Sequence, residues 1–256
     1  MSKSLRVIFC HWCGATGSRR FGRDRSRRQR FHCLFCKRTF IRRTRTARSG
    51  SRLSDPTWNL AMKLFSTRAG LSGADLARVL CVNRKTAHRL NRIFRVLVAP
   101  LAPRTIPGAS EWDEAVMSTQ WVLGGVSRST RQCFLQCIPN RREETLSPLV
   151  EHYTTPEGLV FTDEHHGYNG VYRRMTVCHS REFVNSCARF VHTNTQEGIW
   201  GHLKELSRHL YRGFPREHLP ELLAEFMFRY NVRSYTTRVS VLSALLSRKS
   251  INTHLV

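Results

Sequence analysis

The sequence predicts an α/β protein in which two small N-terminal modules precede a layered domain built on a mixed sheet. Three observations lead to this fold class. Cysteines occur in pairs near the N-terminus, two stretches that follow have apolar residues at helical spacing, and the C-terminal half combines strand-like and helical segments. With 256 residues, 41% of them hydrophobic, the chain is long enough to bury a core.

The N-terminal fifty residues contain two Cys-x-x-Cys pairs separated by nineteen residues, formed by Cys10, Cys13, Cys33 and Cys36. Two such turns supply the tetrahedral sulfur set that structural zinc prefers, so we predict a zinc ribbon over residues 1–50, completed by a basic hairpin. Disulfides or a redox pair are the alternatives. An odd total of nine cysteines argues against the first, and the second needs a thioredoxin-like setting. We expect the other cysteines to be buried apolar side chains: Cys81, Cys133, Cys137, Cys178 and Cys187.

Residues 51–99 are predicted to form a helix-turn-helix. Ser54-Asp55-Pro56 is a helix start, and we expect Gly70 to end that helix. Two further helices, over residues 71–80 and 84–96, flank a three-residue break. The polar face of the last helix suits DNA phosphates and base edges, although a plain basic surface helix is the alternative; its basic residues include Arg84, Lys85, Arg89 and Arg92.

A proline-rich linker is predicted over residues 100–110, and a third domain over residues 111–256. Within that domain, periodicity predicts strands over 112–116, 121–126, 133–138, 158–163 and 175–178, and helices over 142–153, 193–210 and 215–230.

The balance of charge indicates a polyanionic partner. Lys and Arg total 42 against 18 Asp and Glu, and the first fifty residues carry fifteen basic side chains and one acid, Asp24. No apolar run is long enough for a membrane span or a signal peptide. We therefore expect an intracellular protein without a membrane partner, in the bacterial cytoplasm near the nucleoid, or in the nucleus if the source is eukaryotic.

Three acids stand out from this arrangement: Asp113 on the first strand, Asp163 at the end of a later strand, and Glu197 in a closing helix. Buried acids without a partner are costly, so such a group favours a bound cation. Phosphodiester chemistry uses hard oxygen ligands for Mg²⁺ or Mn²⁺, and two ions held by shared carboxylates stabilise both the attacking and the leaving oxygen.

Several segments around these acids match a known family. They are Glu111–Glu114, Phe161–Asp163 with Tyr168–Gly170, His192–Trp200 with Lys204, and Glu225–Arg233. Together they resemble DDE-type insertion-sequence transposases of the bacterial group related to Merlin elements, the ISXO-like group. The cysteine pairs and the helix-turn-helix ahead of them are similar to that group too, so the resemblance covers nearly the whole chain.

The resemblance implies an RNase H-like catalytic domain in which Asp113, Asp163 and Glu197 bind two Mg²⁺ or Mn²⁺ ions. It implies cleavage at the ends of a transposon to expose a 3′ hydroxyl, followed by transfer of that hydroxyl to target DNA. Lys204 would position the end DNA. The implied partners are double-stranded DNA of the terminal inverted repeats, target DNA, and further copies of the chain, because two ends are joined together.

Some assignments stay open. Asn194 is an alternative third ligand, because some relatives use a non-acidic residue there and an amide oxygen also binds hard cations. His179 and His192 are either hydrogen-bond donors to the metal-binding residues or histidines with a structural role. Only six residues separate Glu114 from Trp121, where relatives carry a longer basic insertion.

Two other functions compete with transposition. A zinc-ribbon DNA-binding regulator with an inactive nuclease domain would bind DNA without cutting it. An RNA-binding zinc protein would explain the charge but not the three acids, and the chain lacks the stacking motifs of RNA modules.

Overall fold

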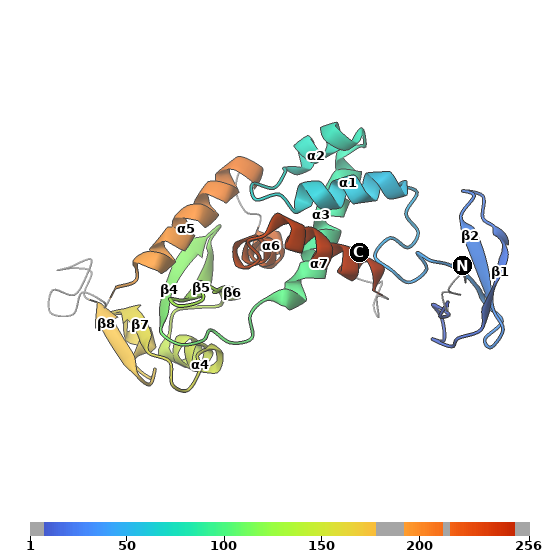
Figure 1. Ribbon diagram of the computed structural model, residues 1–256. Helices are drawn as coiled ribbons and strands as arrows, with labels where there is room; N and C mark the ends of the chain where they lie inside the picture. The colour runs from blue at the N-terminus through green and yellow to red at the C-terminus, as the bar shows by residue number, and fades with distance from the viewer. Residues whose placement is uncertain (1–7, 178–191, 212–215, 249–256) are drawn as a thin grey trace. The chain divides into compact units, whose positions relative to one another are not determined.

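The computed structural model describes residues 8–177, 192–211 and 216–248 (Figure 1). Its strands are β1 (Ser18–Arg23), β2 (Gln29–Cys33), β3 (Thr39–Ile41), β4 (Ser110–Met117), β5 (Gln120–Ser127), β6 (Cys133–Ile138), β7 (Val160–Asp163) and β8 (Arg174–Val177). Its α-helices are α1 (Asp55–Phe65), α2 (Gly73–Leu80), α3 (Arg84–Val98), α4 (Glu143–Tyr153), α5 (Asn194–Leu206), α6 (Leu219–Asn231) and α7 (Tyr235–Ser247). Four short helical turns lie between these elements: η1 (Ala99–Leu101), η2 (His166–Tyr168), η3 (Ser207–Tyr211) and η4 (Arg216–His218).

The chain divides into two units, which are described separately. One unit comprises residues 1–59 and 240–256, and the other comprises residues 60–239. The boundary therefore falls within α1 and within α7, and the second unit holds α2 and α3 together with the large sheet.

The first unit contains a three-stranded antiparallel sheet in the order β1-β2-β3. Phe31 of β2 pairs with Phe40 of β3, and both side chains are buried together with Cys10 and Cys33. A core of this size stabilises a fold only weakly by apolar burial, which is why such modules depend on a metal ion.

Helices α2 and α3 occupy the positions that the periodicity predicts, and side chains fix where both begin. The Ser72 hydroxyl accepts the amide of Asp75 at 3.1 Å, and the Asn83 side chain accepts the amide of Thr86 at 2.8 Å. Cys81, in a left-handed conformation with φ +52°, ends α2. The tight turn between the helices therefore has a specific cap on each side.

The second unit is built on a five-stranded mixed sheet in the order β6-β5-β4-β7-β8. Strands β4, β7 and β8 run parallel, whereas β5 and β6 form an antiparallel meander with β4. The β4–β5 hairpin closes through Ser118 and Thr119, both with positive φ, as tight two-residue hairpin turns require. The predicted mixed sheet is confirmed, and its arrangement is that of an RNase H-like domain.

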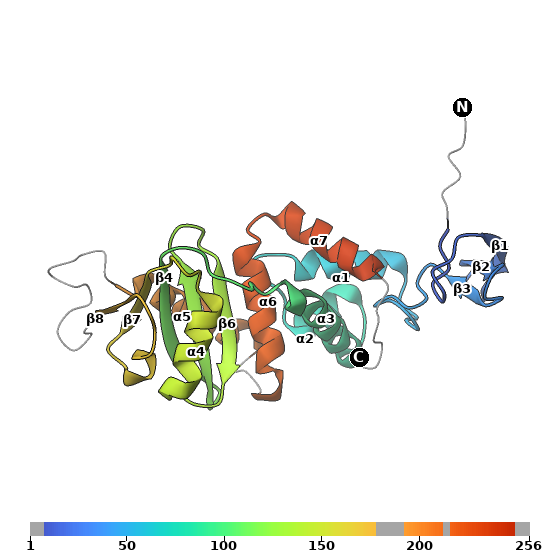
Figure 2. The same cartoon turned by 90° about the horizontal axis from the view of Figure 1, so that it is seen from below.

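Helices α4 and α5 cover opposite faces of this sheet (Figures 1 and 2). Trp112 of β4 packs toward α4 through Phe134, whose ring lies 3.9 Å from that of Tyr153. The next residue, Asp113, points to the other face and meets Trp200 of α5. Alternation along one strand thus directs the apolar core to one layer and the acid to the other.

Gly124 of β5 allows α5 to approach the sheet closely. It pairs with Asp113, and a Cβ at this position would lie 2.1 Å from the Gln196 amide nitrogen and 2.8 Å from the Trp200 ring. Any larger residue would push α5 away from β4.

A buried ion pair fixes the N-terminus of α5 to the sheet. The Glu111 carboxylate, fully buried on β4, accepts the backbone amides of Thr195 at 2.8 Å and Gln196 at 3.1 Å. Arg128 donates to the same carboxylate at 2.8 Å and also to the carbonyl of His192. Glu111 therefore caps α5 from another element, where its charge also interacts favourably with the helix dipole.

Helix α6 covers the β6 edge of the sheet. The side chain of Asn231 accepts the amide of Cys133 and donates to its carbonyl, each at 2.8 Å. On its other side α6 packs against α3, where the Arg95 guanidinium bonds the buried carboxylate of Glu225 at 2.6 Å. These contacts join α3 to the sheet through α6.

The structure corrects two expectations and adds a helix. Helix α1 ends at Phe65, before Gly70. The carbonyls of Ser66 and Thr67 accept hydrogen bonds from arginine side chains and not from the backbone amides of a further helical turn. Cys81 is exposed, because its place as the cap of α2 turns it away from the core. Helix α7 was not predicted.

Cys133 is buried and Cys137 is half-buried, while Cys178 and Cys187 lie outside the described residues. None of the helices in the described ranges is long and apolar enough to cross a bilayer.

Replacing Glu111 with glutamine should destabilise the second unit by about 3 kcal/mol, because Arg128 would keep a buried charge without its partner. Chemical denaturation of the wild type and the variant measures this difference. Glu144→Gln is the matched control, since Glu144 forms an exposed pair with Arg142 whose loss should cost at most about 0.5 kcal/mol. Equal losses in the two variants would contradict the capping role of Glu111.

Candidate functional site

Asp113 and Asp163 occupy equivalent positions on neighbouring parallel strands. Glu111 of β4 pairs with Phe161 of β7, and each acid lies two residues further along its strand. Both side chains therefore point to the same side of the sheet, next to each other. Their mutual repulsion is one of the causes that raise the pKa of Asp113.

Burial is the main reason that the pKa of Asp113 rises to about 7. The Trp200 indole N–H donates to this carboxylate at 2.8 Å and opposes the rise, whereas the charges of Glu114 and Asp163 add to it. The side chain is thus held in one orientation beside other acids.

The loop after β7 is fixed around Asp163. The amide of His165 donates to the Asp163 side chain at 3.1 Å. Arg174 donates to the Asp163 carbonyl at 2.9 Å and to the Thr162 hydroxyl at 2.9 Å. Asp163 therefore has a defined backbone position at the carboxyl end of its strand.

Glu197 lies in the first turn of α5, where it is exposed, and its carboxylate is 3.4 Å from the Thr193 hydroxyl. Trp200, three residues later, contacts Asp113. Residues three apart are neighbours on a helix surface, so Glu197 lies near the edge of α5 that faces Asp113. Lys204 is exposed on the face of α5 that also carries Glu197. Asn194 is exposed as the first residue of α5.

The carboxylate oxygens of the three predicted acids do not lie close enough together to bind one metal ion as they stand. Among the described residues, the group whose ligand atoms all lie within 4.8 Å of one another is the cysteine set, and the acid trio forms no such group. What the structure places together is Asp113 with Asp163, with α5 packed beside them.

The donor chemistry of the pair nevertheless fits a hard cation. Other buried carboxylates of this unit have an arginine partner: Glu111 pairs with Arg128 and Glu114 with Arg141. Asp113 instead accepts a neutral indole N–H and lies beside two further acids. A divalent cation would supply the missing positive charge.

Two supporting acids escaped the sequence analysis. Glu111 caps α5, and Glu114 accepts the Tyr168 hydroxyl at 2.5 Å on the opposite face of the sheet. Burial, and then the charge of Glu114, raise the pKa of Tyr168 and keep it a donor. The sequence shows Glu111 on the same face of β4 as Asp113 and Glu114 on the opposite face, but which elements these acids meet depends on the tertiary fold.

The histidines have separate surroundings. His192 Nδ1 lies 3.4 Å from Glu111, on the α5 cap. His165 accepts the amide of Gly167 through Nδ1 and stacks on His166. His179 lies outside the described residues.

The four cysteines of the first unit form a compact cluster. The sulfurs of Cys10 and Cys36 are 3.6 Å apart, and those of Cys13 and Cys33 are 3.7 Å apart. Four sulfurs at tetrahedral zinc would lie about 3.8 Å from one another, so the cluster fits a structural zinc ion. The amide of Cys36 donates to the Cys33 sulfur, and this is the main cause that lowers the pKa of Cys33 to about 6.

The predicted basic face of α3 is only partly free. Arg84, Lys85 and Arg89 are exposed on α3, whereas Arg92 is ion-paired with Glu221 of α6 at 3.1 Å. The exposed part of this face is therefore its N-terminal half.

The comparison with known proteins agrees with the geometry. Residues 110–231 match the model of the ISXO2-like transposase domain. This segment belongs to the ISXO2-like transposase family. An uncharacterized transposase-like protein of Haemophilus influenzae is 27% identical over 115 residues, which are 43% of this chain and 89% of that protein. The resemblance seen in the sequence is confirmed for these residues, and it supports a transposase role.

The transposase domain matched here contains Asp113, Asp163 and Glu197, and the cysteine cluster lies ahead of it. The family is one of nucleic-acid-processing enzymes.

Replacing Cys33 with serine should abolish zinc binding and unfold the ribbon, because the small core around Phe31 and Phe40 depends on the metal. Metal analysis of the purified protein is expected to fall from one zinc ion per chain to none. Cys81→Ser, at an exposed cysteine outside the cluster, should retain the zinc. Retention of zinc by the Cys33 variant would rule out a four-thiolate site.

Without divalent metal, the transposase domain should lose stability as pH rises from about 4 to about 7, because the folded state holds the Asp113 proton more tightly than the unfolded chain. The full effect is up to about 4 kcal/mol. Asp113→Asn should remove this dependence and be more stable than the wild type at pH 8.

Thermal unfolding at pH 5 and pH 8, in EDTA and in Mg²⁺, measures the effect. Mg²⁺ should stabilise the wild type at pH 8 and leave Asp113→Asn unchanged. Glu157→Gln, at an exposed acid, should behave as the wild type. A pH response that persists in Asp113→Asn would show that another group is responsible.

Proposed function

We propose that this protein is a DDE transposase that cleaves DNA at transposon ends and joins the ends to target DNA. The observation that carries the proposal is the placement of Asp113 and Asp163 side by side on parallel strands β4 and β7. Glu197, on the helix that packs against them, is proposed as the third acid.

Asp113, Asp163 and Glu197 would hold two Mg²⁺ or Mn²⁺ ions. When bound, such ions stabilise the attacking and leaving oxygens of a phosphodiester. Trp200 orients Asp113 through its indole N–H, and Glu111 fixes the start of α5. The protein's own contribution is therefore to hold carboxylate oxygens in position before DNA arrives.

In the proposed reaction, water first attacks the phosphodiester at the transposon end, and the 3′ hydroxyl leaves with a proton. That hydroxyl then attacks a phosphodiester of target DNA, forms a new P–O bond and displaces the target's own 3′ hydroxyl. Lys204, seven residues after Glu197 on α5, is proposed to contact a phosphate of the end DNA.

DNA binding is proposed for the N-terminal modules. The exposed Arg84, Lys85 and Arg89 at the start of α3 suit phosphates and base edges, while Arg92 already has an acidic partner. The ribbon region adds positive charge, with fifteen Lys and Arg among the first fifty residues.

We propose the functional boundaries that the sequence predicts: ribbon 1–50, helix-turn-helix 51–99, linker 100–110 and catalytic domain 111–256. We propose assembly of more than one copy on paired DNA ends, in the bacterial cytoplasm near the nucleoid.

Asp163→Asn should reduce Mg²⁺- or Mn²⁺-dependent cleavage of DNA carrying the flanking repeats by about 100-fold or more, because it removes a metal-binding oxygen. DNA affinity should remain within about twofold, because Asp163 lies outside the basic surfaces. Sequencing-gel assays of end-labelled DNA measure cleavage and locate the 3′ ends.

Glu164→Gln is the matched control at the next position, where the side chain is exposed, and it should cleave as the wild type does. Cleavage that survives Asp163→Asn would refute the assignment of the site. Binding without cleavage by either protein would indicate a DNA-binding regulator instead.

A further inference from the structure

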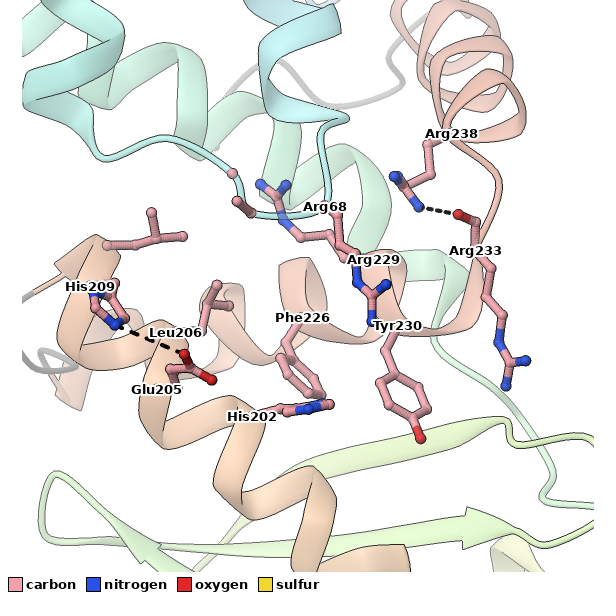
Figure 3. A pocket seen from close by; sticks show the side chains of 13 residues that line it. Arg68, His202, Glu205, Leu206, His209, Phe226, Arg229, Tyr230, Arg233 and Arg238 are labelled. Atoms are coloured by element: carbon pink, nitrogen blue, oxygen red, sulfur yellow. Dashed lines mark hydrogen bonds and ion pairs between the residues drawn. The ribbon is translucent and has the colours of Figure 1, made fainter.

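A cavity of about 800 Å³ lies within the second unit, bounded by α5 with the turn after it, by α6, and by the loop that follows α1 (Figure 3). From α5 and η3 it is lined by His202, Glu205, Leu206 and His209. These residues recur at helical spacing on a face of α5 turned away from Glu197 and Lys204. The cavity is therefore separate from the proposed catalytic site.

One wall of the cavity is aromatic. Phe226 and Tyr230 of α6 stack with their ring centroids 5.8 Å apart and their planes 19° apart. Tyr230 is only partly buried, and Figure 3 shows its side chain beside that of Phe226. His202 of α5 lines the same cavity. Flat rings facing a cavity provide a surface on which a nucleobase stacks.

The rest of the lining is strongly basic, with four arginines, Arg68, Arg229, Arg233 and Arg238, against one acid, Glu205. Glu205 is close to His209, at 4.0 Å. Burial, and then the charges of Arg229 and Arg68, lower the pKa of Arg238, so these guanidinium groups act on one another. The cavity is thus suited to an anion.

The four arginines differ in their partners. Arg229 donates to the Thr67 carbonyl and the Glu225 carboxylate, and Arg238 donates to the Ser66 carbonyl at 2.6 Å. In contrast, Arg68 and Arg233 are exposed residues, and their guanidinium groups make no hydrogen bond or ion pair with the rest of the described chain. The side chains of Arg68 and Arg233 are therefore available to bind an anionic ligand.

We propose that this cavity binds an unpaired nucleotide of a single DNA strand. The base would stack on Tyr230 and Phe226, and the phosphates would bind Arg68 and Arg233. A duplex does not fit this chemistry, because the faces of its bases are already stacked on one another and none is free to stack on an aromatic side chain. The volume is in the range of cavities that enclose small organic ligands. The choice of DNA over RNA rests on the proposed function.

The first test measures the affinity of the full-length protein, carrying Asp163→Asn to prevent cleavage, for a fluorescent single-stranded octathymidylate and for a labelled duplex. Arg68→Gln and Arg233→Gln should each weaken single-strand binding about threefold to tenfold and leave duplex binding within about twofold. Arg104→Gln, at an exposed arginine outside the cavity, should change neither affinity. Equal weakening of both affinities, or no weakening, would overturn the proposal.

A second measurement locates the base. A single strand carrying 5-iododeoxyuridine is crosslinked by light and the modified peptide is identified by mass spectrometry. Crosslinking within α6 at Phe226 or Tyr230 is expected, and its loss in Tyr230→Leu would support stacking. Crosslinks confined to residues 1–59 would overturn the assignment.

An RNA octamer that binds more tightly through the same arginines would overturn the choice of DNA. None of these measurements depends on cleavage. They can therefore fail while the catalytic assignment holds, or succeed while it fails.

Discussion

The carboxylate of Glu111 is the contact on which the arrangement of β4 and α5 depends. It lies on β4, two residues before Asp113, and it accepts the amides of Thr195 and Gln196 in the first turn of α5. Glu197 lies in that same turn, and Trp200 follows Gln196 by four residues. One buried charge therefore sets the position of the helix relative to the strand. The spacing of acids along β4 places the residue that caps α5 and the proposed metal ligand Asp113 on the same face of a single strand.

Acids are scarce in this basic chain, and many of those it has are used inside the second unit. Glu111, Glu114 and Glu225 are buried with arginine partners, which makes their charge part of the scaffold. Asp113 differs, because its neighbours are a neutral donor and two acids. The same domain thus contains acids whose charge stabilises the fold and one, Asp113, whose charge destabilises it. Such local cost is common where a protein holds groups ready for a ligand.

The sequence predicted the elements better than their contacts. Strands with continuous apolar runs and helices with clear caps, such as α2 after Ser72, were found close to their observed bounds. Helix α7 was missed because its apolar residues do not gather on one face. The exposed Cys81 was misjudged because hydrophobicity alone does not reveal a left-handed cap.

The site itself was predictable only in part. Asp113 and Asp163 follow from strand ends and from the family resemblance, but the roles of Glu111, Trp200 and Gly124 depend on residues about 85 positions apart that meet only after folding. The cavity beside α6 combines residues from three distant segments for the same reason.

The covering of β6 by α6 has a consequence for assembly. Asn231 uses its amide group to satisfy both the N–H and the C=O of Cys133, the two groups that a neighbouring strand would otherwise bond. A second copy of the chain cannot extend the sheet at this position unless the end of α6 first moves away. In the assembly proposed above, copies of the chain would therefore meet at this edge through side-chain surfaces or through DNA, and not by pairing of strands.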